Sequence, residues 1–124
     1  MTLSYSLVSK LASALCFILF ATLLLVPGLI YWIFELVGND VSDLMAKRAA
    51  MLFLGIAVLI FLSRNASPSQ LRANLCFALA VMMAGLAGVG LFEFVRGAVG
   101  IGIWLAIVTE ISFALAYFKL SKQE

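Results

Sequence analysis

One ionisable side chain, Glu110, lies deep inside an apolar stretch of this 124-residue sequence. It is the only charged residue between positions 97 and 118, and Lys119 follows nine positions after it. In a membrane-spanning helix the Glu110 carboxyl would lie near the middle of the bilayer, out of reach of water. An ionisable group at that depth is a candidate site for a proton, a cation or a ligand.

Two free-energy costs determine whether Glu110 is charged or neutral inside a membrane. Protonating a glutamate carboxylate at pH 7 costs roughly 3.7 kcal/mol, and inserting a charged residue at a helix centre costs roughly 2.5 to 3.5 kcal/mol. Because the two costs are similar, water entry or a nearby cation could switch the carboxyl between its two protonation states. One hypothesis is therefore a small proton- or cation-coupled transporter or channel subunit that uses Glu110.

A structural role for Glu110 is the competing hypothesis. Its helical ridge is otherwise built of the small residues Gly102, Ala106 and Ala114, which let a neighbouring helix approach closely. We expect this ridge to pack against a second row of small residues, Cys76, Ala80, Ala84 and Gly88. Glu110 would then donate a hydrogen bond inside the bundle, and its candidate acceptors by depth are Thr22 and backbone carbonyls near Gly55 or Gly85.

Three further charged residues, Glu35, Glu93 and Arg96, are expected to gather at the outer ends of the first and third spans. Glu93 and Arg96 are three positions apart, so they would pair across one helical turn. An exposed pair of this kind contributes little to stability, and an ordinary solvated helix end explains it equally well.

Other familiar chemistry is excluded by residue type. The sequence has no histidine, and its two cysteines, Cys16 and Cys76, fall in separate apolar blocks. Haem or zinc sites with imidazole ligands and histidine-dependent triads are therefore ruled out. No phosphate-binding glycine motif and no basic soluble arm is present. We expect no catalytic residue, metal, cofactor or nucleic-acid partner, and we expect the protein not to be an enzyme.

The amino-acid composition indicates whether the helices that carry these residues lie in water or in lipid. Hydrophobic residues make up 65% of the chain and charged residues 11%, and the mean hydropathy is +1.20. A soluble domain is roughly 45 to 50% apolar and about 25% charged. The sequence therefore predicts an integral membrane protein in contact with the lipid bilayer.

Four apolar blocks predict an all-α membrane protein, a single domain with four transmembrane helices in an antiparallel up-down bundle. A span needs roughly 20 helical residues, which places the spans at about 9–34, 43–63, 72–95 and 98–119. The second block is short, so its helix must begin before the block, with cap candidates at Asn39, Asp40 and Ser42. Pro27 should kink or stop the first helix, and residues 27–37 either complete that span or lie in the interface.

Basic residues near the span ends predict the orientation. With four spans, five basic residues share the side of the two termini, namely Lys10, Arg64, Arg72, Lys119 and Lys122. Three lie on the opposite side, namely Lys47, Arg48 and Arg96. This excess predicts an inner membrane protein with both termini in the cytoplasm.

A partial internal match predicts a parallel repeat of two hairpins, with chance similarity of leucine-rich spans as the alternative. Residues around Cys16 recur sixty positions later around Cys76, and Phe34-Glu35 recurs as Phe92-Glu93. The two thiols would lie at matching depth, and we expect them to be small core residues rather than a disulfide.

Three segments carry a resemblance: Lys47 to Gly55, the polar turn Arg64 to Pro68, and Gly90 to Gly97. In their layout they resemble small bacterial four-span membrane proteins of uncharacterised function, distantly similar to the DoxX-like families. The resemblance implies a four-span protein of a bacterial inner membrane. It implies no reaction, no cofactor and no catalytic residue.

Three functions follow from the sequence. The first is a non-enzymatic bundle that acts by association with itself, as a homo-oligomer, or with another membrane protein. The second is the transporter or channel subunit based on Glu110. The third is a binder of an apolar ligand such as a lipid or quinone, which the scarcity of polar orienting groups disfavours.

Overall fold

A computed structural model of the protein describes residues 4–122. These residues form five α-helices and no strand. They are α1 (Tyr5–Leu25), α2 (Pro27–Ile33), α3 (Asp40–Leu62), α4 (Gln70–Val95) and α5 (Ile103–Lys122). All except the short α2 are long and apolar enough to cross a membrane. The expectation of an all-helical bundle with four candidate spans is confirmed.

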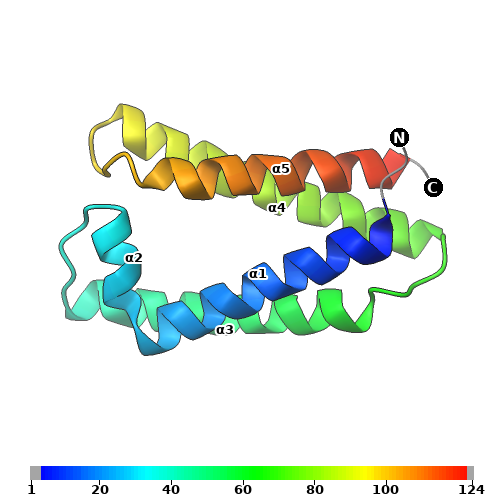
Figure 1. Cartoon of the computed structure of the whole chain (residues 1–124), viewed down its shortest axis with the longest axis horizontal. Helices are drawn as coiled ribbons and strands as arrows, with labels where there is room; N and C mark the ends of the chain where they lie inside the picture. The colour runs from blue at the N-terminus through cyan, green and yellow to red at the C-terminus, as the bar shows by residue number, and fades with distance from the viewer. Residues whose placement is uncertain (1–3, 123–124) are drawn as a thin grey trace.

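Pro27 ends the first span. The last residue of α1 is Leu25, Val26 is not helical, and Pro27 then occupies the first turn of α2, where its missing N–H costs nothing. The expected span 9–34 is therefore two helices. Figure 1 shows that α2 turns away from the direction of α1 and runs across one end of the molecule.

The next span begins where polar residues can cap it. The Asn39 side chain accepts a hydrogen bond of 2.8 Å from the Ser42 N–H, and the Ser42 hydroxyl accepts one of 2.8 Å from the Asn39 N–H. This reciprocal arrangement is a capping box, which satisfies two backbone donors at the helix start. The prediction that α3 begins ahead of its apolar block, with Asn39 and Ser42 in the cap, is confirmed.

Two helix pairs make up the molecule. The span α1 packs along α3, and α4 packs along α5, whereas α1 touches α5 much less. In Figure 1 the two pairs are close where α1 begins and α5 ends, and they separate toward the end that holds α2. The bundle is therefore a wedge and not a set of four parallel rods.

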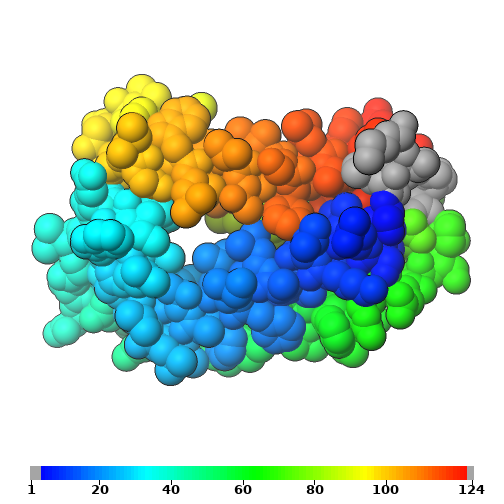
Figure 2. Space-filling view, in the orientation of Figure 1, coloured from blue at the N-terminus to red at the C-terminus, as the bar shows by residue number. Residues whose placement is uncertain are grey.

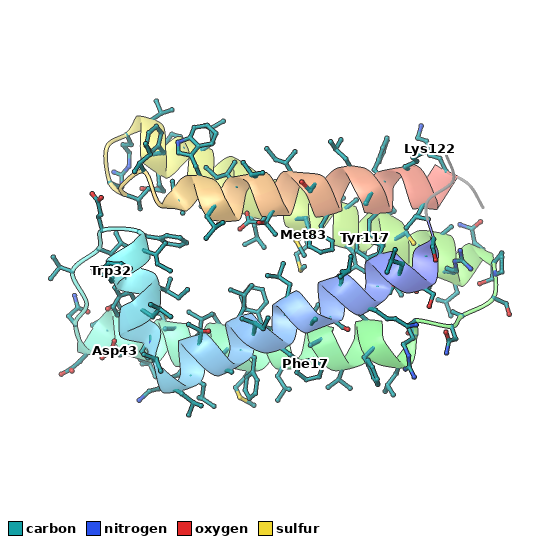
Figure 3. All side chains as sticks on the ribbon, in the orientation of Figure 1. Phe17, Trp32, Asp43, Met83, Tyr117 and Lys122 are labelled. Carbon is teal, nitrogen blue, oxygen red and sulfur yellow. The ribbon has the colours of Figure 1, made fainter. Side chains whose placement is uncertain are left out.

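The closed end of the wedge holds the main core. Buried residues from all four spans meet there, namely Tyr5, Val8, Ala12, Cys16, Ala57, Ile60, Cys76, Leu79, Ala80, Tyr117 and Leu120. Tyr117 lies where α5 approaches α1 (Figure 3), and its hydroxyl donates a hydrogen bond of 3.3 Å to Ser9 Oγ. Both residues are fully buried. This contact ties the two helix pairs together.

The open end is bridged by α2. The Tyr31 hydroxyl donates a hydrogen bond of 2.9 Å to Asp43 Oδ1 on α3, and the Gly100 N–H, in the loop before α5, donates one of 2.8 Å to the Phe34 carbonyl. Gly102 lies directly against the Ile33 carbonyl, which leaves no room for a Cβ at that position. A second, smaller core of Ala87, Ile103 and Ile107 lies beside Phe34. The short helix therefore acts as a strut between the two pairs.

The proposed repeat is reflected only in part of the structure. Cys16 and Cys76 are both fully buried, and the following residues, Phe17 and Phe77, are both exposed. Both cysteines are free thiols, as expected for core residues. The outer match fails, because Phe92-Glu93 lies inside α4 whereas Glu35 follows α2 with a positive φ of 56°. The sequence match is therefore reflected in burial only around the cysteines, whereas the pairing of α1 with α3 and of α4 with α5 agrees with an arrangement of two helix pairs.

Candidate functional site

Between the two cores lies a cavity of about 300 Å³. Side chains from every helix line it, namely Leu15, Leu19, Leu23, Ile30, Ile33, Phe34, Phe53, Met83, Leu86, Leu105, Ala106, Thr109 and Glu110. Figure 3 shows Met83 projecting from α4 into the space between the helix pairs. Figure 2 shows the same region as a hollow between the cyan and blue segment and the orange one. We call this space the central cavity.

The shape of the central cavity follows from the wedge. The closed end is held by the Tyr117 core, and α2 holds the other end apart through Tyr31 and Phe34. Since α1 and α5 touch little along their length, the cavity reaches the outer surface between them. In a membrane this opening would face lipid, because α1 and α5 are both apolar spans.

Glu110 is the polar feature of the cavity wall. Of the thirteen lining residues, eleven are apolar and the other two are Thr109 and Glu110. The Thr109 hydroxyl donates a 2.8 Å hydrogen bond to the Leu105 carbonyl of its own helix. Within residues 4–122, the half-buried Glu110 carboxyl makes no hydrogen bond and no salt bridge. Among the described lining residues, Glu110 is therefore the polar side chain whose hydrogen-bonding groups are all available to another molecule, whereas the Thr109 hydroxyl can only accept.

The hydrogen bond expected between Glu110 and Thr22 is not formed. The Thr22 hydroxyl donates a 2.8 Å hydrogen bond to the Ile18 carbonyl one turn earlier in α1, and Thr22 does not line the cavity. Gly55 and Gly85 have no atoms of neighbouring elements within 4 Å of a Cβ position. The prediction was wrong because matching depth does not determine which way each helix is rotated.

The predicted pairing of the two rows of small residues is wrong, although Cys76 and Ala80 of the α4 row are buried in the main core. Ala84 and Gly88 are exposed, and α5 faces α4 with Ile103 and Ile107, which pack on Gly90. The ridge of Ala106 and Glu110 instead faces the central cavity, and Gly102 lies against α2. The contact between the two helices therefore pairs isoleucines of α5 with other small residues of α4, Ala87 and Gly90.

The outer charged residues separate into a pair and a single residue. The Arg96 guanidinium donates to Glu93 Oε2 through Nη2 at 2.8 Å and through Nε at 3.1 Å, so the expected pair is confirmed. The exposed Glu35 lies against Gly100, in the loop that leads into α5. Among the described residues, no hydrogen bond or ion pair joins Glu35 to the Glu93–Arg96 pair.

Sequence reasoning missed most of the cavity wall. Phe53, Met83 and Leu86 are apolar residues in apolar spans, and the composition of a span does not distinguish a side chain that faces a cavity from one that faces lipid. The break at Pro27 was the available signal, since a broken helix in a small bundle leaves space that a straight helix would fill.

Comparison with known proteins does not assign this chain to a family. No protein-family model, curated protein or solved structure matches the chain. The likeness to the DoxX-like families therefore remains a resemblance in layout.

Proposed function

We propose that this protein binds an apolar, membrane-dissolved molecule of the lipid or quinone class in the central cavity, without catalysing its conversion. The observation that carries the proposal is the combination of a cavity of about 300 Å³ with Glu110 as the unpartnered polar group in its wall. Small-molecule sites are mostly apolar and use a few polar groups to orient the ligand.

The volume of the central cavity and the chemistry of Glu110 limit the class of ligand that can bind. An engineered apolar cavity of about 150 Å³ binds benzene, so the central cavity has room for a ring bearing a short tail or for part of an acyl chain. A neutral Glu110 carboxyl can donate a hydrogen bond to a carbonyl oxygen of the ligand. A quinone or an ester-containing lipid has both the apolar body and such an oxygen.

Ligand binding was the third of the three functions considered from the sequence, and the structure is the reason to propose it first. The structural hypothesis needs a hydrogen-bond partner for Glu110, and the described residues offer none. The transport hypothesis needs a series of polar groups along a path, whereas the wall around Glu110 is apolar. Ligand binding uses the cavity and the lone carboxyl together.

The experiment compares a cavity-filling variant with a matched control. Ala106→Phe places a ring in the central cavity, and Ala84→Phe places the same ring on the exposed face of α4. Each variant is purified in detergent, and its organic extract is analysed by mass spectrometry. We expect an apolar compound to accompany the wild type and Ala84→Phe and to be lost from Ala106→Phe. Identical extracts from folded samples of all three would refute the proposal.

Association is a second candidate function, favoured by the exposed position of Ala84 and Gly88. Small residues four positions apart on a lipid-facing surface allow close contact between helices of two copies. Gly88→Ile should therefore shift the protein toward monomer in crosslinking experiments in membranes, whereas Val89→Ile, also on the exposed surface of α4, should not.

The location is proposed from the charge distribution. The excess of basic residues at the end where α1 begins and α5 finishes supports a bacterial inner membrane protein with this end in the cytoplasm. Single cysteines introduced at Asn65 and Gly97, in a variant whose native thiols are replaced by alanine, should be labelled by impermeant reagents from opposite sides. Labelling of Gly97→Cys from the cytoplasmic side would overturn this orientation.

A further inference from the structure

A second, polar hollow lies at the closed end of the wedge. It has a volume of about 360 Å³, and we call it the arginine hollow. Its wall consists of residues at the start of α1, in the α3–α4 connection and at the start of α4, namely Ser4, Tyr5, Ser6, Arg64, Asn65, Ala66 and Arg72. Figure 1 shows that these segments come together at the end opposite α2.

Both guanidinium groups of the hollow are held in place. Arg64 Nη1 donates a 2.7 Å hydrogen bond to the Phe61 carbonyl, and its Cζ lies 3.9 Å from the centre of the Phe61 ring. Arg72 Nη1 donates a 2.9 Å hydrogen bond to the Ala66 carbonyl, and its Cζ lies 4.1 Å from the centre of the Tyr5 ring. Side chains fixed in this way lose little further entropy when an anion binds.

The described wall of the hollow is basic. Within residues 4–122 its lining contains two arginines and no acidic residue, and the sequence has no Asp or Glu from position 44 to position 92. The helices α1 and α4 begin here, capped by Ser4 and Ser69, and α3 ends here, so two positive dipole ends and one negative end face this region. The two guanidinium groups therefore supply the main attraction for an anion.

The donor set suits a phosphate group. A guanidinium presents five N–H donors in a planar fork that matches phosphate oxygens, and Arg64 uses one of its donors for the Phe61 carbonyl. In the same wall the Ser6 hydroxyl donates a 3.4 Å hydrogen bond to Asn65 Oδ1, which leaves the NH₂ group of Asn65 as a neutral donor. The hollow therefore offers charged and neutral donors from three chain segments.

The position of the hollow identifies the source of the phosphate. Arg64 follows the end of α3 by two residues, and Arg72 lies in the first turn of α4, so both lie where a span meets the lipid headgroups. Leu7 and Leu71 beside the hollow are 57% and 79% exposed, which gives acyl chains an apolar surface directly next to the charged groups. Free phosphate would make no use of that surface.

We propose that the arginine hollow is a binding site for the phosphate headgroup of an anionic phospholipid. The site is independent of the central cavity, since the two share no residue. It holds one lipid at the end where the two helix pairs meet. Bound there, the lipid bridges α1 with the α3–α4 connection and stabilises the closed end of the wedge.

The test measures lipid binding to the purified chain by native mass spectrometry. The probes are dioleoyl phosphatidylglycerol, dioleoyl phosphatidylcholine and inorganic phosphate. The main variant is Arg64→Gln, whose contacts within the chain are local to the end of α3. The matched control is the double variant Lys47→Gln with Arg48→Gln, which removes two exposed basic residues near the other end of the bundle.

We expect wild type to prefer phosphatidylglycerol over phosphatidylcholine and Arg64→Gln to weaken phosphatidylglycerol binding about tenfold, as the loss of a charge-assisted hydrogen bond implies. The control variant should retain the wild-type preference. If Arg64→Gln does not fold, Arg64→Lys replaces it, and losing the fork while keeping the charge should still weaken binding. An equal loss in the control, or displacement of the lipid by millimolar inorganic phosphate, would overturn the proposal.

Discussion

Replacing Glu110 by leucine should stabilise the folded protein. The Glu110 side chain is half-buried in the wall of an apolar cavity and has no hydrogen-bond or salt-bridge partner within residues 4–122. Leucine is similar in length and has no polar group to satisfy. A residue that is kept for binding and not for packing is expected to lower stability in this way.

The size of the effect can be bounded. On an insertion scale, a leucine is favoured over an acidic residue at a helix centre by about 3 kcal/mol. The unfolded chain in the membrane carries the same side chain at a similar depth, so most of this difference cancels. What remains is the cost of an unpaired polar group, about 1 to 3 kcal/mol when fully buried. Because Glu110 is half-buried, we expect a gain of about 1 kcal/mol.

The assay is reversible unfolding by sodium dodecyl sulfate in mixed micelles, followed by far-ultraviolet circular dichroism. Glu110→Gln is the control, because it leaves an unpaired polar group in place, and it should remain within about 0.5 kcal/mol of wild type. A loss of stability of about 1 kcal/mol or more in Glu110→Leu would refute the reasoning, since it would mean that Glu110 has a partner in the folded bundle.

Three further predictions concern the contacts that hold the wedge. In a double-mutant cycle, Tyr117→Phe and Ser9→Ala should show a coupling of about 0.6 kcal/mol, typical of hydrogen bonds inside membrane bundles; additive losses would mean that the 3.3 Å contact contributes nothing. Gly102→Ala should destabilise the fold by about 1 to 3 kcal/mol because its Cβ would overlap the Ile33 carbonyl, whereas Gly85→Ala, with no neighbour within 4 Å, should not. Asn39→Ala should cost about 1 kcal/mol through loss of the capping box, and an unchanged unfolding midpoint would count against that role.

Apolar length and cap residues were sufficient to predict four membrane-spanning helices, although not their exact bounds. The start of α3 at Asp40 and the interruption of the first span at Pro27 both follow from local rules that need no tertiary information. The Glu93–Arg96 pair follows in the same way from spacing within one helix. These features depend on neighbours in the sequence, which is why they could be predicted.

Helix rotation could not be predicted. Every face of these spans is apolar, so hydrophobic periodicity does not mark the buried side, and a row of small residues suits a lipid-facing surface as well as a packed one. Ala84 and Gly88 were placed in a seam and are exposed, while Ile103 and Ile107 form the actual contact with α4. The partner of Glu110 depended on that rotation, and the error therefore carried over to Thr22.

The arginine hollow could not be predicted either, because it depends on how distant segments of the chain meet. Arg64 and Arg72 were used only to orient the chain, because their sequence positions give charge and approximate depth. Their convergence with Ser4 and Tyr5 requires α1 to begin beside the α3–α4 connection. Sequence separation of about sixty residues hides that proximity.

The central cavity depends on residues that have no functional group. Pro27 stops α1, so the chain turns across the end of the bundle instead of continuing along α3. Gly100 and Gly102 then let α2 and the residue after it reach the loop before α5 without a side chain in between. The two helix pairs meet at the Tyr117 core, and α2 holds them apart at the other end. The space between them is the central cavity, and Glu110 lines it. The site is therefore determined by one proline and two glycines as much as by its carboxyl group.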